Sequence, residues 1–233
     1  MIHQFIFAGP KPGLSAEAFQ CYWVHFHAVD YAARIPQIRQ YLVAPRLRYP
    51  CKREVPFFEG VAEIWVANEE EQIASFRSPE FLQGARADEP RWAAFWQTFV
   101  HEAESVVIRE SVSSTTEFTK FYSFLKRQPG TDLDEFRRLL LKAHGETVLA
   151  LPGLQGYLIG FARRGLYGLG EPRFDAIEVW SFEDLEKMRE ALVPERLEAV
   201  EESWRSVADD RYLFTFVGRE NWIIRPGERS GGA

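Results

Sequence analysis

Apolar and polar residues follow two different periods along the chain. Residues 2–8 form a short apolar run bounded by a Gly-Pro pair, which is typical of a strand. Phe19, Trp23 and Phe26 then recur at spacings of four and three residues, which predicts a helix. The helix is expected to end near Ile35, because the residue before a proline disfavours helical angles.

The remaining elements follow from alternation, turn residues and proline breaks. In the first half, strands are expected at 39–45, 59–66 and 105–110, with a helical region from residue 69 that breaks near Pro79 and Pro90. In the second half, strands are expected at 120–125, 155–162, 174–181 and 211–217, and helices at 133–150, 182–192 and 194–207. Both halves thus have the order strand–helix–strand–strand–helix–strand, which is the ferredoxin-like arrangement.

Short motifs also recur, at a constant offset of 117 residues. Pro12-Gly13, Phe19 and His27 return as Pro129-Gly130, Phe136 and His144. This period is far longer than the roughly 20–50 residues of a solenoid repeat, so it indicates a duplicated domain. The expected division is a first half at 1–112, a linker at 113–118, a second half at 119–224 and a flexible tail without core contacts at 225–233.

The predicted fold class is α+β, with two tandem ferredoxin-like halves packed sheet to sheet as a single-chain, pseudo-dimeric α+β barrel. Two helices cover only one face of each sheet, and face-to-face packing would hide the other.

Alternation along the third strand of each half predicts which side chains face this interior. Ala62 and Ile64, like Ile177 and Val179, are expected under the helices. Glu63 and Trp65, like Glu178 and Trp180, are expected on the opposite face, related by a pseudo-twofold axis.

Candidate chemistry follows from these positions. Burial would raise the pKa of Glu63 and Glu178 and suit either carboxyl for acid–base catalysis. The alternative is that each pairs with an arginine, such as Arg39, Arg163 or Arg164, at a solvated barrel mouth. His27 and His144 are candidates for proton transfer, because histidine titrates near neutrality; the alternative is that each packs at a helix end.

A metal site is not expected. His25 and His27 lie two residues apart on the predicted helix and point in different directions, and the sequence has no Cys/His cluster.

Composition narrows the partners. The chain is 46% hydrophobic, with 19 Phe and 7 Trp, so some aromatic rings are expected to line a pocket for an apolar ligand. A net charge of −6 gives no support for binding nucleic acid. No apolar run is long enough to span a membrane. Two cysteines without a disulfide framework, and an N-terminus without a signal peptide, predict a cytoplasmic protein.

The segment from Pro12 through Phe19, Trp23 and His27, together with 58–65, resembles the EthD-like domain family. The stretches 129–145 and 174–180 resemble a second, more diverged copy, in which Leu140 replaces the tryptophan. The resemblance implies the dimeric α+β barrel superfamily, whose members include cofactor-free dehydratases, decarboxylases, cyclases and an isomerase. It also implies that His27 is the acid–base residue. Because the second copy departs from the pattern at Leu140 and Gly145, any chemistry is expected in the first half.

Three functions remain open from the sequence. The leading one is a cofactor-independent lyase, cyclase or isomerase acting on a small apolar or aromatic, polyketide-like or catabolic molecule. In it, His27 moves a proton, Glu63 is its partner, and Trp23, Trp65, Tyr41 and Trp180 line the pocket. The alternatives are a non-enzymatic protein that binds an apolar compound and a haem-dependent enzyme with His27 or His144 as axial ligand. Pairing of two such chains into a homodimer of pseudo-dimers is also expected.

Overall fold

The computed structural model describes the chain except for residues 51–52, 54, 56, 112–116 and 230–233. The described residues divide into two compact units. Unit 1 takes its residues from 1–48, 56–104 and 218–233, and unit 2 from 49–55 and 105–217. Most of the predicted linker lies outside the described residues.

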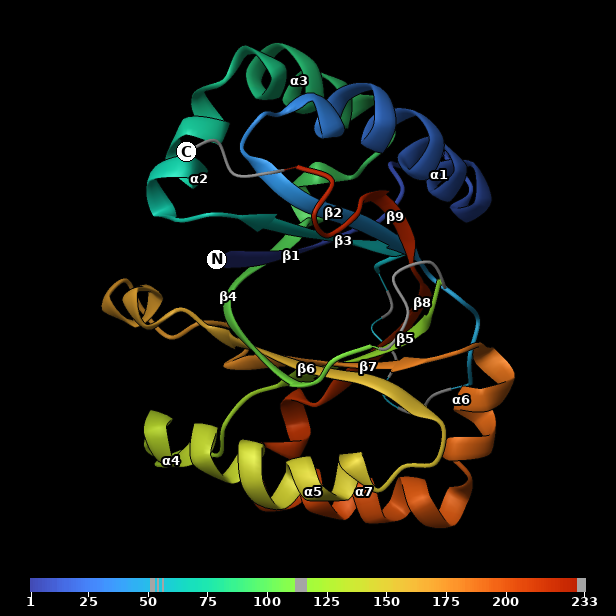
Figure 1. The fold of residues 1–233 in the computed structure, drawn as a ribbon, viewed down its shortest axis with the longest axis vertical. Helices are drawn as coiled ribbons and strands as arrows, with labels where there is room; N and C mark the ends of the chain where they lie inside the picture. The colour runs from blue at the N-terminus through green and yellow to red at the C-terminus, as the bar shows by residue number, and fades with distance from the viewer. Residues whose placement is uncertain (51–52, 54, 56, 112–116, 230–233) are drawn as a thin grey trace. The chain divides into compact units, whose positions relative to one another are not determined.

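Unit 1 is an antiparallel sheet with helices on one face (Figure 1). Its strands, in the order of the sheet, are β4 (Phe99–Arg109, whose last residues belong to unit 2), β1 (Ile2–Ala8), β3 (Gly60–Val66), β2 (Ile38–Pro45) and β9 (Asn221–Ile224). Its helical segments are α1 (Ala16–Tyr22), η1 (Trp23–Tyr31), η2 (Ala32–Arg34), α2 (Glu69–Arg77), η3 (Glu80–Ala85), α3 (Arg86–Asp88), η4 (Glu89–Arg91) and η5 (Phe95–Gln97).

Unit 2 repeats this architecture. Its sheet has the order β8 (Phe214–Arg219), β5 (Thr119–Leu125), β7 (Ala176–Phe182) and β6 (Leu154–Ala162), with the end of β4 beyond β6. Its helical segments are α4 (Leu133–Leu139), η6 (Leu140–His144), α5 (Gly145–Leu149), η7 (Arg164–Gly168), α6 (Leu185–Ala191), α7 (Pro194–Val207) and η8 (Asp210–Tyr212). The order fourth–first–third–second in both sheets is that of a ferredoxin-like fold, as predicted.

Local signals explain how the first helix of each unit starts. Gly13 has φ 88° and Gly130 has φ 84°, values that glycine adopts without steric cost, so the repeated Pro-Gly pair turns the chain from strand to helix. Ser15 then caps α1 by accepting a hydrogen bond from the backbone N–H of Ala18, and Asp132 caps α4 in the same way.

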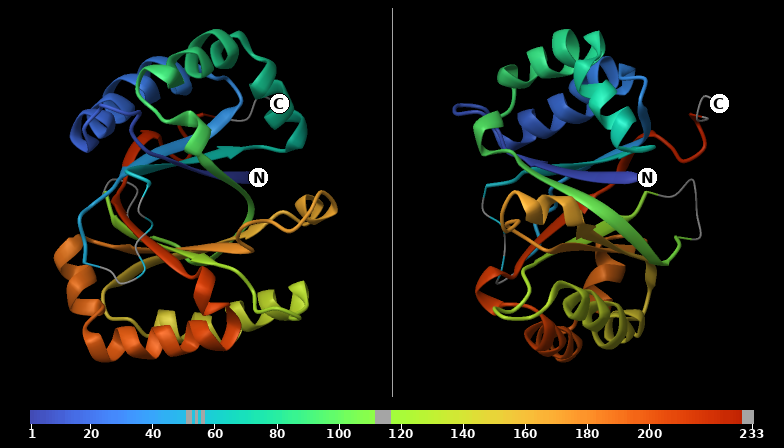
Figure 2. Two further views of the ribbon diagram at one scale, coloured as in Figure 1. Left: turned by 180° about the vertical axis from the view of Figure 1, so that it is seen from behind. Right: turned by 90° about the vertical axis from the view of Figure 1, so that its left-hand side faces the viewer.

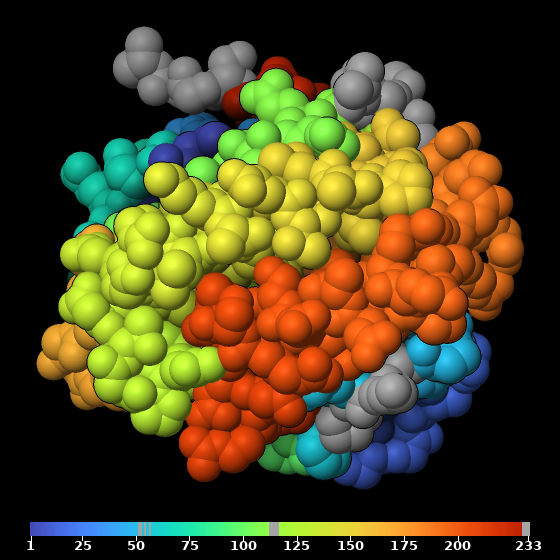
Figure 3. Space-filling model, turned by 90° about the horizontal axis from the view of Figure 1, so that it is seen from below, coloured from blue at the N-terminus to red at the C-terminus, as the bar shows by residue number. Residues whose placement is uncertain are grey.

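In each unit, the helices pack on one face of the sheet (Figure 2). In unit 1, Phe19, Trp23 and Trp92 pack against Ala62 and Ile64 of β3, as the alternation predicts for this face. In unit 2, α5 and α7 lie against each other and form a continuous outer surface (Figure 3). None of the described helices is both long and apolar enough to cross a membrane.

The C-terminal segment differs from the expectation. Residues 221–224, assigned from sequence to the second half, form β9 and pair with Tyr41–Val43 of β2 in unit 1. The predicted tail is also not frayed over 225–229, because the Arg229 guanidinium donates hydrogen bonds to the backbone carbonyls of Ala33, Ile35 and Ile38. The expectation of a tail without contacts is therefore wrong for 225–229, while 230–233 lie outside the described residues.

Candidate active site

A cavity of about 340 Å³ lies in unit 1, between the sheet and the helices that cover it. Ala62, Ile64 and Ile6 form its sheet side, and Trp23, Tyr41 and Trp92 form aromatic walls. Phe76, Phe95 and Val100 also line it while remaining exposed to solvent, so the cavity has an apolar entrance. Its volume is at the lower end of the range for small-molecule pockets, which suits a ligand of one or two rings.

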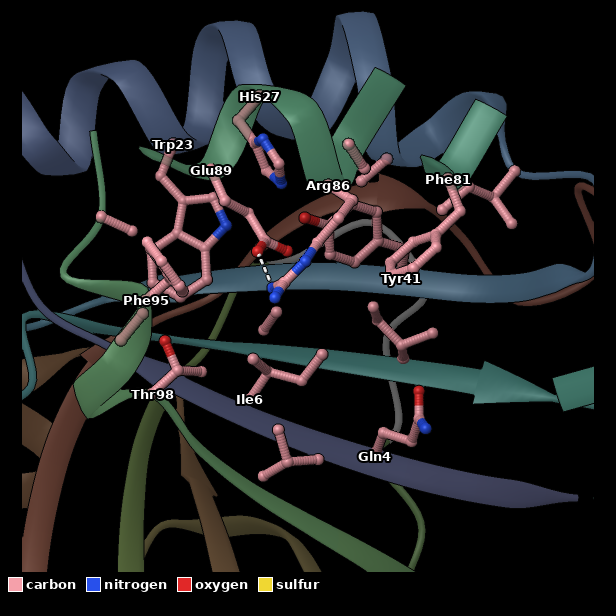
Figure 4. Close-up of a pocket in the computed structure, with 18 of the residues that line it drawn as sticks. Gln4, Ile6, Trp23, His27, Tyr41, Phe81, Arg86, Glu89, Phe95 and Thr98 are labelled. Atoms are coloured by element: carbon pink, nitrogen blue, oxygen red, sulfur yellow. Dashed lines mark hydrogen bonds and ion pairs between the residues drawn. The ribbon is translucent and has the colours of Figure 1, made fainter. Parts of the chain in front are cut away.

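His27 reaches this cavity from η1, a π-helical segment (Figure 4). π-Helical turns are rare in proteins and are frequent at functional sites. The η6 segment, which carries His144, is also π-helical, so both histidines of the repeat sit on this irregularity rather than on the plain α-helix predicted.

Asp88 holds the His27 ring from the side away from the cavity. Its Oδ2 atom lies 3.0 Å from Nδ1 of His27, and both side chains are buried. The other carboxylate oxygen accepts a hydrogen bond from the Tyr22 hydroxyl at 2.9 Å and lies 3.5 Å from the Arg91 guanidinium.

This arrangement defines the state of the His27 ring. A carboxylate only accepts hydrogen bonds, so Nδ1 of a neutral His27 must carry the proton. Nε2 then carries the lone pair, and it has no hydrogen-bond partner among the described residues. Burial lowers the pKa of His27, and the Asp88 carboxylate partly offsets this effect. The geometry is that of a histidine oriented by a carboxylate and ready to accept a proton.

A second polar pair lies in the same cavity, facing His27 in Figure 4. The Arg86 guanidinium is 2.5 Å from Oε2 of Glu89. Burial raises the pKa of Glu89, and Arg86 opposes this shift. The guanidinium carbon of Arg86 also lies 5.4 Å from the centre of the Phe95 ring, within the range of a cation–π contact.

Strand register shows which positions of unit 2 correspond to the cavity. Ile6 pairs with Ala62 in unit 1, and Ser123, 117 residues after Ile6, pairs with Glu178 in unit 2. Glu178 therefore corresponds to Ala62. Trp180 likewise corresponds to Ile64. Tyr41 of β2 pairs with Ile64, and Tyr157 of β6, the second strand of unit 2, pairs with Trp180.

The space beside His144 is filled accordingly. The Glu178 carboxylate contacts Nε2 of His144 at 3.1 Å and accepts hydrogen bonds from the Tyr157 hydroxyl at 2.5 Å and the Trp204 indole at 2.9 Å. Trp180 stacks on Trp204 with ring centres 5.3 Å apart. Nδ1 of His144 lies 3.0 Å from the Ser203 hydroxyl, and the ring is completely buried.

These contacts correct two expectations about Glu178 and Trp180. Both face the helices of unit 2, not the opposite face of the sheet, and they are not the counterparts of Glu63 and Trp65. The two glutamates pair when residues 58–65 are aligned with residues 174–180 with one residue dropped, and a slip of one residue moves a side chain to the other face. Pairing of Glu178 with an arginine is also wrong, because its partners among the described residues are His144, Tyr157 and Trp204.

In unit 1, Glu63 and Trp65 lie on the face of β3 opposite to the cavity. Glu63 is buried, 3.1 Å from Nε2 of His3, and the His3 ring stacks on Trp65 with ring centres 4.0 Å apart. Glu63 therefore does not orient His27, and Trp65 does not line its cavity. His27, Trp23 and Tyr41 do share the cavity, and their catalytic or binding roles stay predictions.

Asp88, Arg86 and Glu89 are not among the residues predicted from the sequence. They lie in short helical turns between the two prolines that break the pattern, and no repeat partner marks them. One usable signal was the cluster of charged residues before Pro90 in a region rich in aromatic side chains.

The described residues fit a haem poorly. An axial histidine needs a free ring nitrogen, and both nitrogens of His144 are occupied. Nε2 of His27 is open, but its cavity is small and contains the Arg86–Glu89 ion pair. Within the described part of the chain, no group of three or more His, Cys, Asp or Glu side chains is placed to hold a metal ion.

Comparisons of the whole chain with solved structures show its fold. An anthrone oxidase-like protein is similar over 100% of this chain and 95% of its own, with a TM-score of 0.64 and 12% identity. A "putative monooxygenase" from Lactobacillus acidophilus NCFM covers 97% of this chain and 96% of its own, with a TM-score of 0.56 and 11% identity. A mutant chlorite dismutase from Candidatus Nitrospira defluvii covers 94% and 91%, with a TM-score of 0.52 and 12% identity. At these identities the similarity concerns the fold, and it confirms the predicted α+β class of tandem ferredoxin-like halves.

A comparison with curated proteins found no match. The family model of the EthD domain matches residues 11–95, which include His27, Asp88 and most of the cavity. This part of the first half is therefore similar in sequence to an EthD domain.

Proposed function

We propose that the protein is a cofactor-independent lyase, cyclase or isomerase that removes a proton from a small apolar or aromatic molecule bound in the unit 1 cavity. The observation that carries this proposal is the placement of His27. Its Nε2 atom faces the cavity without a partner among the described residues, while the buried Asp88 carboxylate holds Nδ1.

The chemistry assigned to His27 is general base catalysis. Nε2 takes a proton from carbon, and the resulting imidazolium is stabilised by the Asp88 carboxylate 3.0 Å from Nδ1. The same imidazolium then returns the proton to another atom of the substrate or to a leaving group. The lowered pKa of His27 keeps the free base populated at neutral pH. Such a sequence moves protons and requires no electron carrier.

The surroundings support a ring-shaped, largely apolar substrate. Trp23, Trp92 and Tyr41 are almost completely buried around the cavity, so a bound ring would replace water with aromatic surface. Exclusion of water also strengthens the interaction between the imidazolium and Asp88.

The experiment is proton exchange, because it does not require knowledge of the complete reaction. The protein is incubated in D₂O with enolisable ring ketones, such as 1-tetralone, 2-tetralone and 1,3-cyclohexanedione, and deuterium incorporation is followed by NMR. The wild type is expected to accelerate exchange of at least one ketone. His27→Gln is expected to slow that exchange about 10²–10⁴-fold, the usual contribution of a general base.

His25→Gln is the matched control, because His25 lies two residues away on the same segment and is exposed. Equal exchange rates in wild type and His27→Gln would contradict the proposal. Saturable binding of the ketones without accelerated exchange would instead support the binding-protein alternative.

A further inference from the structure

The charged groups in the unit 1 cavity are arranged asymmetrically. Apart from His27, Arg86 is the only lining residue of the described chain that can carry a positive charge. Its side chain is 52% exposed, so it lies at the open part of the cavity, whereas the Glu89 side chain is 23% exposed. Figure 4 shows the guanidinium extending below His27 into the space between Phe95, Tyr41 and Ile6.

The hydrogen-bonding capacity of Arg86 is largely unused. A guanidinium has five N–H donors in a planar fork. Among the described residues, its only hydrogen-bond acceptor is Oε2 of Glu89. The face of the group lies against the Phe95 ring, which leaves its edge for polar contacts. Several of the Arg86 donors therefore have no acceptor among the described residues, at a cavity whose other walls are mainly apolar.

Glu89 alone is not a sufficient partner for this group. The pair is formed by residues three apart in sequence, an arrangement that stabilises exposed helices only slightly. Glu89 is partly buried, and this burial raises the pKa of its carboxyl despite the adjacent guanidinium. A ligand oxyanion that offers two acceptor atoms would match the fork better than the single contact with Glu89.

We propose that Arg86 is the substrate-recognition residue of the cavity. The substrate class is a small one- or two-ring compound that carries an anionic oxygen or an enolisable carbonyl group. The ring lies against Phe95 and Tyr41, the oxygen accepts hydrogen bonds from Arg86, and the acidic C–H faces Nε2 of His27. This inference deepens the proposed function and rests on it for the catalytic role of Arg86.

The step is balanced within the cavity. Nε2 of His27 takes the proton as the C–H bond breaks, and the electron pair of that bond forms the C=C bond of an enolate while the carbonyl π electrons move onto oxygen. Arg86 stabilises the negative oxygen. When His27 returns the proton to carbon, the carbonyl re-forms and no oxidant or reductant is consumed.

Binding is tested with 2-naphthoate and its neutral analogue 2-naphthamide, using isothermal titration calorimetry on the full chain. Wild type is expected to bind the naphthoate at least about tenfold more tightly than the amide. Arg86→Met is expected to reduce this preference to less than about twofold, and Arg86→Lys to leave an intermediate value, because lysine keeps the charge but not the fork. Glu89→Gln is expected to increase the preference, because it removes the competing carboxylate.

Arg189→Met is the matched control, since Arg189 forms an ion pair of the same 2.5 Å length with Glu186, three residues away, on α6 of unit 2. Thermal unfolding of each variant checks that it is folded. A preference that survives in folded Arg86→Met, equal binding of both ligands by wild type, or binding of neither at millimolar concentration would overturn the proposal.

His27→Gln separates this inference from the proposed function. It is expected to slow ketone exchange about 10²–10⁴-fold but to keep the preference for naphthoate. If wild type shows the preference without any exchange, recognition by Arg86 stands and the proton-transfer function fails. If exchange occurs, Arg86→Met is expected to lower kcat about 10²-fold, the effect of losing an oxyanion donor, and an unchanged kcat would remove the catalytic part of the inference.

Discussion

The histidine of the repeat faces a cavity in unit 1, whereas the matching histidine in unit 2 is enclosed by protein. The difference lies in the neighbours. Three residues that line the unit 1 cavity, Gln4, Ala62 and Ile64, are matched in register by Phe121, Glu178 and Trp180. All three replacements are larger, and Phe121, Trp180 and Trp204 form a stack next to His144.

The hydrogen-bond partners of the two histidines also differ, and they too leave only the unit 1 histidine with an open ring nitrogen among the described residues. Nδ1 of His27 has a buried carboxylate as partner and leaves Nε2 open, whereas His144 has a hydroxyl on one nitrogen and a carboxylate on the other. The first arrangement leaves one ring nitrogen open to the cavity, as the proposed base requires, and the second uses the ring to connect α7 to β7. Duplication has thus preserved the residue but not its surroundings, and the surroundings decide whether a histidine can react.

The largest expected effect is on stability, and it separates the two histidines. His144→Ala removes a hydrogen-bond partner from both the buried Glu178 carboxylate and the Ser203 hydroxyl and leaves a cavity beside them, so unfolding by urea should show a loss of about 3–5 kcal/mol. His27→Ala should cost less, about 1.5–3 kcal/mol, because Asp88 keeps the Tyr22 hydroxyl and the Arg91 guanidinium. Equal losses in the two variants would show that the network around His144 is no more important for stability than the site around His27.

The same comparison shows what could be predicted from the sequence. The order of elements and the ferredoxin-like topology followed from periodicity and turn residues, because those signals are local. His27 stood out because it recurs, and Trp23 because of its helical spacing. The register of β7 was not accessible, since Phe174–Trp180 can be aligned with the first half in more than one way, and one residue decides the face.

The partners of His27 were hidden for a different reason. Asp88 lies 61 residues away, in a three-residue helical turn that no periodic pattern announces. Its contact with His27 depends on the path of the chain between Pro79 and Pro90, and just after this segment Trp92 packs on Phe19 and Trp23. Strand alternation correctly places Glu63 on the face of β3 opposite to the helices. Glu63 is nevertheless not the partner of His27, because the cavity lies on the helix-covered face.

A second expected effect concerns ligand binding, and it would make unit 1 resemble unit 2. Ile64→Trp introduces the residue found at the matching position 180 and should fill the cavity, so that affinity for 2-naphthoate falls by at least about tenfold, or 1.4 kcal/mol. Isothermal titration calorimetry measures the effect. Ile73→Trp adds the same volume at an exposed position of α2 outside the cavity, and it should leave the affinity unchanged. Undiminished binding by Ile64→Trp would place the ligand site elsewhere.

The smallest expected effect is a pH dependence that unit 1 should show through His27. Burial lowers the pKa of His27 below its ordinary value of 6.5, and the opposing hydrogen bond and charge of Asp88 do not reverse the shift. Above pH 6.5 the residue is neutral in both the native and the unfolded chain, so it adds no pH dependence there. As the pH falls below 6.5, the unfolded chain binds the proton first, and the free energy of unfolding should decrease until the native pKa is reached.

The rate of ketone exchange should likewise fall at low pH, with an apparent pKa below 6.5. His27→Gln should remove this contribution from urea unfolding measured between pH 5 and 8, whereas His25→Gln, which changes an exposed ring, should retain it. An activity profile with an apparent pKa above 6.5 would mean that the Asp88 carboxylate, and not burial, dominates the state of the His27 ring.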